Sequence, residues 1–366
     1  MSRIFIAGLG AVSPAGWNVV ALRAALNNGA PLPVQTLERP GWEEPLPARL
    51  VPSPTSRPEF LTHPRLRRTS PLTHYVVATA LEATTELRAN RDPGLRLGLV
   101  VCLQSGCVNY SCRFYEETLK DPATASPLLF PETVYAAPAS HLAAVLENVS
   151  LATSLVGDPA TFLQGVSLSA QWLEANRVDA CLVIGAEETN WITADALWHL
   201  DRPAVIAVGA GTLCLCRDPE LSVGVALAAI TDAHTYSTRN SRTQAARSMR
   251  EQLGKLGAPA SSRPAASRRN EEIAGRTPAL RETVELLCDS LGNSPRTDAA
   301  ELTAWRDWTG ARVSPKRILG EGMMAAAAWQ CVAACDMVAG GRFTAANVSL
   351  VGSNQQAMGA RFVGAI

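Results

Sequence analysis

The sequence predicts an α/β protein in which buried strands alternate with helices. Its most informative stretch, residues 151–188, is predicted to form a strand, an abrupt turn, a helix and a second strand at 180–184. The run Leu-Gly-Leu-Val-Val-Cys-Leu at 97–103 is apolar throughout, which is typical of a buried strand. An alanine-rich helix at 323–338 suits close packing between layers. These features predict a layered fold.

The turn inside the central stretch follows Gly157, which breaks the strand. Asp158 and Pro159 predict a helix start, because aspartate is a favoured N-cap and proline loses nothing at the first helical position. The helix is expected to end at Asn176. Its first turn points backbone N–H groups and a positive dipole end at whatever lies in front. Many enzymes place a nucleophile there, whereas this chain has a proline.

The N-terminal segment is predicted to contain a strand at 4–12 and a helix at 19–26. Gly8 and Gly10 form a lone G-x-G, and no third glycine follows at the spacing of dinucleotide-binding loops. We therefore predict no phosphate site there. Residues 30–66 are rich in proline and are expected to form an irregular surface excursion.

A helix is expected at 76–89, and another follows the strand at 97–103. On the second helix, Cys107, Tyr110 and Phe114 share one face, because they lie three and seven positions apart. Ordinary core packing is the simplest interpretation of this face.

The remainder of the chain is predicted to contain strands at 205–216 and 223–230 and a helix at 247–256. Residues 261–269 (SSRPAASRR) are small, basic and aperiodic, so we expect a flexible surface loop. A basic binding patch is the alternative for this stretch. The role of the wider segment 234–284 is not predicted.

The composition excludes several classes of function. Lys+Arg and Asp+Glu number 33 each, so a global binder of nucleic acid or anionic membrane is not expected. The nine cysteines show no C-x-x-C pair and no His/Cys ligand spacing. They are expected to be buried thiols in a reducing cytoplasm, with no metal and no cofactor. No apolar run is long enough to span a bilayer.

The central stretch resembles the β-ketoacyl synthases of the thiolase superfamily. In that family a cysteine within a T-A-C-A-T-like turn begins the helix, and an R-x-D precedes a strand that ends in G-G-A-E. Here Arg177, Asp179 and the Gly-Ala-Glu at 185–187 match the downstream frame. Counting back without gaps places the nucleophilic cysteine of the family at Pro159.

The first histidine phrase of the family, H-G-T-x-T-P-x-x-D-x-x-E, is similar to SLGNSPRTDAAE. Pro295, Asp298 and Glu301 align, and the histidine position falls on Ser290.

The second phrase, S-x-K-x-x-x-G-H, is matched by Ser314, Lys316 and Gly320, with Glu321 at the histidine position. The closing loop at 350–356 lacks the paired glycines and the phenylalanine with which the family gates acyl chains and builds an oxyanion site.

These losses predict a catalytically inactive protein. Condensation needs a thiolate to hold the acyl chain, and it needs hydrogen-bond donors to stabilise the enolate formed on decarboxylation. Pro159 offers no nucleophile, Ser290 replaces one donor, and Glu321 would add negative charge where negative charge develops. Cys288 or Ser290 could act as a substitute nucleophile, but no histidine is placed to activate either.

The resemblance implies a thiolase-like αβαβα fold of two pseudo-repeated halves, with 1–218 and 219–366 forming one structural unit. It further implies a chain length factor of type II polyketide synthases, which pairs with an active ketosynthase subunit while an acyl carrier protein delivers the chain. Cys107, Tyr110 and Phe114 would then form the chain-length pocket. Two alternatives remain: an acyltransferase of the superfamily with displaced catalytic residues, and a structural or starter-priming subunit.

Overall fold

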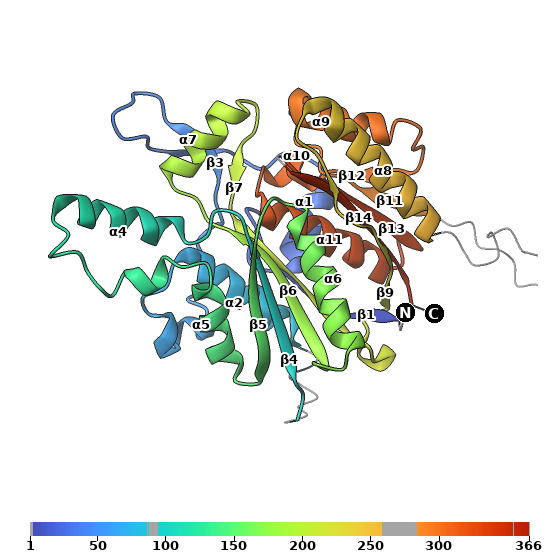
Figure 1. Ribbon diagram of the computed structural model, residues 1–366, viewed down its shortest axis with the longest axis horizontal. Coiled ribbons are helices and arrows are strands. Elements are labelled where there is room, and N and C mark those ends of the chain that lie inside the picture. Colours follow the sequence, from blue (N-terminus) through green and yellow to red (C-terminus); the bar gives the residue numbers. More distant parts are fainter. Residues whose placement is uncertain (1–2, 86, 88–93, 258–283, 354, 366) are drawn as a thin grey trace, which may run out of the picture.

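The computed structural model describes residues 3–85, 87, 94–257, 284–353 and 355–365 (Figure 1). Its strands form two five-stranded sets of the same topology. The N-terminal set runs in the spatial order β1-β8-β6-β4-β5. These strands are β1 (Ile4–Val12), β4 (Leu97–Leu103), β5 (Val149–Val156), β6 (Ala180–Glu187) and β8 (Gly209–Cys216).

The C-terminal set repeats this order as β9-β14-β13-β11-β12. Its strands are β9 (Val225–Ile230), β11 (Glu285–Cys288), β12 (Ala311–Val313), β13 (Ala345–Val351) and β14 (Gln356–Gly364). The two sets also share their strand directions. In the N-terminal set β4 is parallel to β5 and β6, and in the C-terminal set β11 is parallel to β12 and β13. The other neighbouring strands within each set are antiparallel. A short antiparallel pairing of β1 with β9 joins the sets. The boundary at residue 218 stays a prediction.

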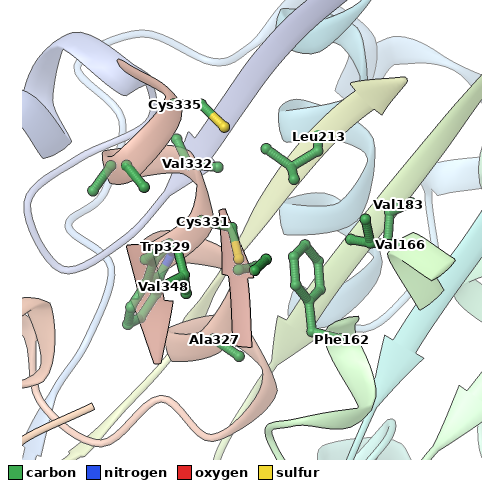
Figure 2. Packing of buried hydrophobic residues seen from close by; sticks show 14 of the residues in the cluster. Phe162, Val166, Val183, Leu213, Ala327, Trp329, Cys331, Val332, Cys335 and Val348 are labelled. Carbon is green, nitrogen blue, oxygen red and sulfur yellow. The ribbon is translucent and has the colours of Figure 1, made fainter. Parts of the chain in front are cut away.

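Helices form three layers around these strands. Between the two sets lie α6 (Thr161–Glu174) and α11 (Met324–Ala339), whose side chains share one apolar cluster with both sets. Figure 2 shows Phe162 of α6 and Leu213 of β8 in this cluster with Trp329, Val332 and Cys335 of α11. The outer layers are α2 (Pro71–Ala83) with α5 (Ala137–Leu146), and α8 (Arg239–Gly257) with α9 (Pro295–Ala304). The predicted αβαβα architecture is confirmed.

The remaining elements lie around this body. They are α1 (Val19–Asn28), α4 (Val108–Lys120), α7 (Trp191–Leu200), α10 (Pro315–Leu319) and β10 (His234–Thr235), with 3₁₀ turns at Glu59–Thr62, Pro64–Leu66, Phe130–Glu132 and Pro219–Leu221. In Figure 1, α4 extends well away from the strands.

The excursion at 30–66 is less irregular than predicted. It contributes β2 (Gln35–Leu37) and β3 (Leu46–Arg49) to a three-stranded sheet completed by β7 (Ile206–Ala207). β3 pairs with the nearby β2 and also with β7, which lies more than 150 residues later in the chain. Local sequence could not predict the pairing of β3 with β7.

Other predicted bounds changed at their ends. The strands at 4–12 and 97–103 are confirmed, whereas the helix expected at 76–89 begins at Pro71 and ends at Ala83. The predicted strand 205–216 is broken at Val208, just before Gly209, which has a φ of 146° and begins β8. The basic stretch 261–269 lies outside the described residues.

Gly8 and Gly10 serve packing. A Cβ at Gly8 would lie 1.9 Å from the carbonyl oxygen of Ala83, and one at Gly10 would lie 2.0 Å from that of Thr79. The two glycines therefore allow α2 to lie directly against β1, which explains the lone G-x-G without any ligand.

Candidate functional site

The turn before α6 differs from the prediction, because the helix begins at Thr161 and not at Pro159. The carbonyl oxygen of Asp158 accepts from Thr161 N at 2.8 Å, and that of Pro159 accepts from Phe162 N at 3.2 Å. Pro159 is buried within this turn and has no N–H to offer.

The Asp158 side chain accepts hydrogen bonds from backbone N–H groups of two separate segments. Its Oδ1 accepts from Ala160 N at 3.2 Å, while its Oδ2 accepts from the backbone N–H groups of Gln355 and Gln356 at 3.0 and 3.2 Å. The carboxylate thus ties the turn at Pro159 to a loop almost 200 residues later in the chain. A local sequence pattern carries no signal for such a contact.

Ser290 is fully engaged in structural hydrogen bonds. Its Oγ donates to Glu301 Oε2 at 2.6 Å and accepts from Val351 N at 3.2 Å. Its own N–H also donates to Glu301 Oε2, at 3.0 Å. The neighbouring Cys288 is fully buried, and burial raises the pKa of its thiol well above the ordinary value. Neither group is placed as an activated nucleophile.

Glu321 forms an ion pair and does not face an open site. Its Oε2 lies 2.8 Å from Nζ of the buried Lys316, and its Oε1 accepts from Met323 N at 2.8 Å. Its backbone is held between Val205 and Ala207, next to the small sheet. The carboxylate has no hydrogen to donate to a developing enolate, so the donor expected at this position is absent.

The two histidine positions belong to one polar network. Glu301 binds Ser290, and the positive charge of Lys316, the partner of Glu321, acts on Glu301. Burial and, to a smaller extent, the nearby Asp289 raise the pKa of Glu301 to about 8 against the opposing effects of Ser290, Ser349 and Lys316. Pro159 is connected to this network through Asp158 and the loop that follows Val351.

The predicted chain-length face divides between core and surface. Cys107 precedes α4 and is buried, with its Sγ 3.6 Å from Ser70 Oγ, and burial raises its pKa to about 12. Tyr110 and Phe114 remain half-buried, and the Phe114 ring lies 5.6 Å from that of Phe130. Burial and the charge of Glu132 raise the pKa of Tyr110. No residue within α4 itself is buried.

Two adjacent carboxyl groups at the end of β6 were not predicted as site residues. Glu187 accepts from Gln104 N at 2.6 Å and from Ser105 N at 3.2 Å. Glu188 accepts from Leu72 N at 3.0 Å and from Asn109 N at 2.9 Å, and it thereby holds the N-termini of α2 and α4. Burial raises the pKa of Glu187 to about 8. The Gly-Ala-Glu motif at 185–187 marked this strand end in the sequence, but it did not indicate which groups the carboxylates bind.

No metal or membrane feature accompanies this site. The described residues contain no group of three His, Cys, Asp or Glu side chains that could hold a metal ion. Of the helices that the structure describes, none combines the length and the apolarity that crossing a bilayer requires. All nine cysteines are free thiols.

This site, at the junction of two repeated α/β halves, places the chain in a known structural class. No protein-family model and no curated protein sequence matches it. Solved structures do: that of "The ishigamide ketosynthase/chain length factor" matches with a TM-score of 0.78 at 17% identity, covering 99% of each chain. The chain therefore has the fold of these ketosynthase structures.

Two further structures place it beside paired and carrier-bound ketosynthases. The AntDE:AntF complex, a type II polyketide synthase acyl carrier protein with its ketosynthase, matches with a TM-score of 0.74 at 12% identity over 99% of each chain. The ketosynthase ApeO in complex with its chain length factor ApeC, from Xenorhabdus doucetiae, matches with a TM-score of 0.75 at 13% identity, covering 100% of this chain and 98% of that one.

We expect the protein to lose stability as the pH rises through neutrality. Glu187 and Glu301 have an ordinary pKa of 4.5 and a folded-state pKa of about 8. Because the folded pKa is the higher, this stability is fully present below pH 4.5 and is lost as the pH rises through about 8. Each group contributes at most about 1.4 kcal/mol per pH unit to the free energy of unfolding.

Urea unfolding at several pH values measures this slope. The side chain introduced by Glu187→Gln does not titrate and keeps an acceptor for Gln104 N. The variant is therefore expected to show a smaller decrease of the free energy of unfolding per pH unit, by about the contribution of one group. Glu174→Gln, at the exposed end of α6, is the matched control and is expected to leave it unchanged. An unaltered slope in Glu187→Gln would contradict the assignment.

Proposed function

We propose that this chain is a catalytically inactive, ketosynthase-like subunit that acts as a chain length factor. It pairs with an active ketosynthase and shapes the acyl tunnel while a type II polyketide or polyene chain is extended on an acyl carrier protein. The observation that carries the proposal is the retention of the ketosynthase fold around three reactive positions occupied by Pro159, Ser290 and Glu321. The two polar replacements are committed to structural bonds, which supports inactivity.

The pairing surface that we propose starts at β5. Among the described residues, this strand is the edge of the N-terminal set and pairs only with β4, so we propose that its other side offers backbone groups for pairing. Val156 at its end is 53% exposed. Ser154 Oγ donates to the carbonyl oxygen of Tyr135, which links the edge to the segment that carries Phe130.

Exposed apolar side chains are also found on and near α4. Phe130 packs on Phe114, and on the same helix as Phe114, Leu119 is 67% exposed. We propose that these side chains belong to the same protein–protein interface as the β5 edge. In the ApeO–ApeC and ishigamide structures a ketosynthase is named together with a chain length factor, and such a ketosynthase is the occupant that we propose.

The chain alone is expected to be chemically inert. It should form no acyl thioester and should not decarboxylate malonyl carrier protein, because no activated nucleophile or enolate donor is present. Pro159→Cys alone should not restore condensation, since Ser290 and Glu321 still replace both donors. Intact-protein mass spectrometry after incubation with acyl donors tests this, and stable acylation of the wild-type chain would refute it.

An obligate 1:1 heterodimer is expected with a cysteine-bearing ketosynthase. Its interface should reach about 2,000 Å² or more, the range of obligate complexes. Leu119→Asp places a charge in the proposed surface and should weaken co-purification of the two subunits. Leu302→Asp on α9, where the wild-type side chain is 45% exposed, is the matched control and should not. Analytical ultracentrifugation showing a well-behaved monomer that the partner leaves unchanged would contradict the pairing.

Longer products are expected when a large side chain of the predicted chain-length pocket is replaced by alanine. If Tyr110 and Phe114 close the tunnel, Tyr110→Ala or Phe114→Ala opens volume, and each added methylene then gains roughly 0.8 kcal/mol by burial. Phe343→Ala, which truncates a half-buried phenylalanine after α11, controls for general loss of stability. The product profile of the reconstituted pair decides: unchanged lengths at reduced yield would indicate packing alone.

A further inference from the structure

The turn between β13 and β14 is held by side chains from both halves of the molecule. The carbonyl oxygen of Gly352 accepts from Tyr236 Oη and, at 2.6 Å, from Arg242 Nη2. Gly352 N donates to the carbonyl oxygen of Gln356 at 2.9 Å, which closes the turn on itself. Tyr236 N donates to the carbonyl oxygen of Gln355 at 2.8 Å. The segment before α8 is thus joined to both ends of the turn.

The other side of the turn is bound by residues at or next to the positions that align with catalytic residues of the family. Asp158, next to Pro159, accepts from Gln355 N and Gln356 N. Ser290 accepts from Val351 N. The Gln356 side chain donates to Thr161 Oγ1 at 3.1 Å, so it reaches the first residue of α6. Three backbone N–H groups of the turn are therefore already bound within the chain.

Opening this turn would be costly. Asp158 is 4% exposed and Arg242 is 7% exposed, and neither has an ion-pair partner among the described residues. The turn accepts the hydrogen bond of Arg242 Nη2 and donates two hydrogen bonds to Asp158, so moving it would remove these partners from two buried polar groups. Gly352 also fits closely, since a Cβ there would lie 2.0 Å from Asp158 Oδ2.

We infer that Asp158, Ser290, Tyr236 and Arg242 are positioning residues that act as a lock and hold residues 351, 352, 355 and 356 of the turn in the observed conformation. In this state the N–H groups of Val351, Gln355 and Gln356 are bound to Ser290 and Asp158 and cannot donate to the carbonyl of an acyl thioester. The inference goes beyond the proposed function, because the lock would exist whether or not the chain sets product length.

Hydrogen exchange followed by mass spectrometry on the full-length chain tests the lock. In the wild type, the amides of Val351, Gln355 and Gln356 should be protected although Gln355 is exposed. Asp158→Asn presents an amide N–H in place of a carboxylate oxygen, and exchange at Gln355 and Gln356 should become at least about tenfold faster. Ser290→Ala should accelerate Val351 more than Gln356.

Tyr236→Phe is the mildest variant and should loosen the turn least. Its matched control is Tyr135→Phe, which removes a tyrosine hydroxyl bonded to the carbonyl oxygen of Gln104, far from the turn in sequence. The control should leave exchange at 351–356 unchanged. Millimolar octanoyl-pantetheine should not alter the wild-type protection, because the donors are already occupied.

Unprotected amides at Gln355 and Gln356 in the wild type would overturn the lock, as would wild-type exchange rates in a folded Asp158→Asn protein. A change of protection on adding octanoyl-pantetheine would also overturn it. If Asp158→Asn does not fold, Ser290→Ala and Tyr236→Phe provide the test. Product profiles of the reconstituted pair are a separate readout, so failure of the lock is distinguishable from failure of the proposed function.

Discussion

The burial of α11 between the two five-stranded sets is the constraint on which the rest of the molecule depends. All residues from Met324 to Val338 are buried, so this helix has no solvent-exposed face and depends on both halves to cover it. Close approach is possible because alanines on the helix meet glycines on the strands. A Cβ at Gly185 or Gly211 would lie within 3 Å of the Ala328 methyl group. Trp329 then donates to the carbonyl oxygens of Val12 and Ala210, each at 3.0 Å.

The three positions that align with reactive residues of the resembled family lie near this central helix. Glu321 lies just before α11, Pro159 lies just before α6, and Ser290 follows β11, so all three positions border the same interior. A buried polar group needs a partner. Ser290 donates to Glu301, and Lys316 forms an ion pair with Glu321, so both aligned positions take part in bonds within the fold.

The elements that sequence predicted well are those whose signal is local. The apolar strands β1 and β4 have the predicted bounds. Signals that depend on distant partners failed. The start of α6 was misplaced: Asp158 lies before the helix, where one carboxylate oxygen accepts from Ala160 N and the other from Gln355 N. Glu187 was interpreted only as part of a motif, and the role of Glu188 at the N-termini of α2 and α4 was not predicted.

The sequence by itself determined the α/β class and the absence of a nucleophilic side chain at Pro159, because periodicity and residue identity are properties of the chain alone, while the repeated halves were implied by the resemblance of its motifs to a family. Only the tertiary structure decided what Ser290, Glu321 and Asp158 do instead. Their partners come from segments that approach through packing of the two halves around α11, and hydrogen bonds between segments so far apart leave no periodic trace in the sequence.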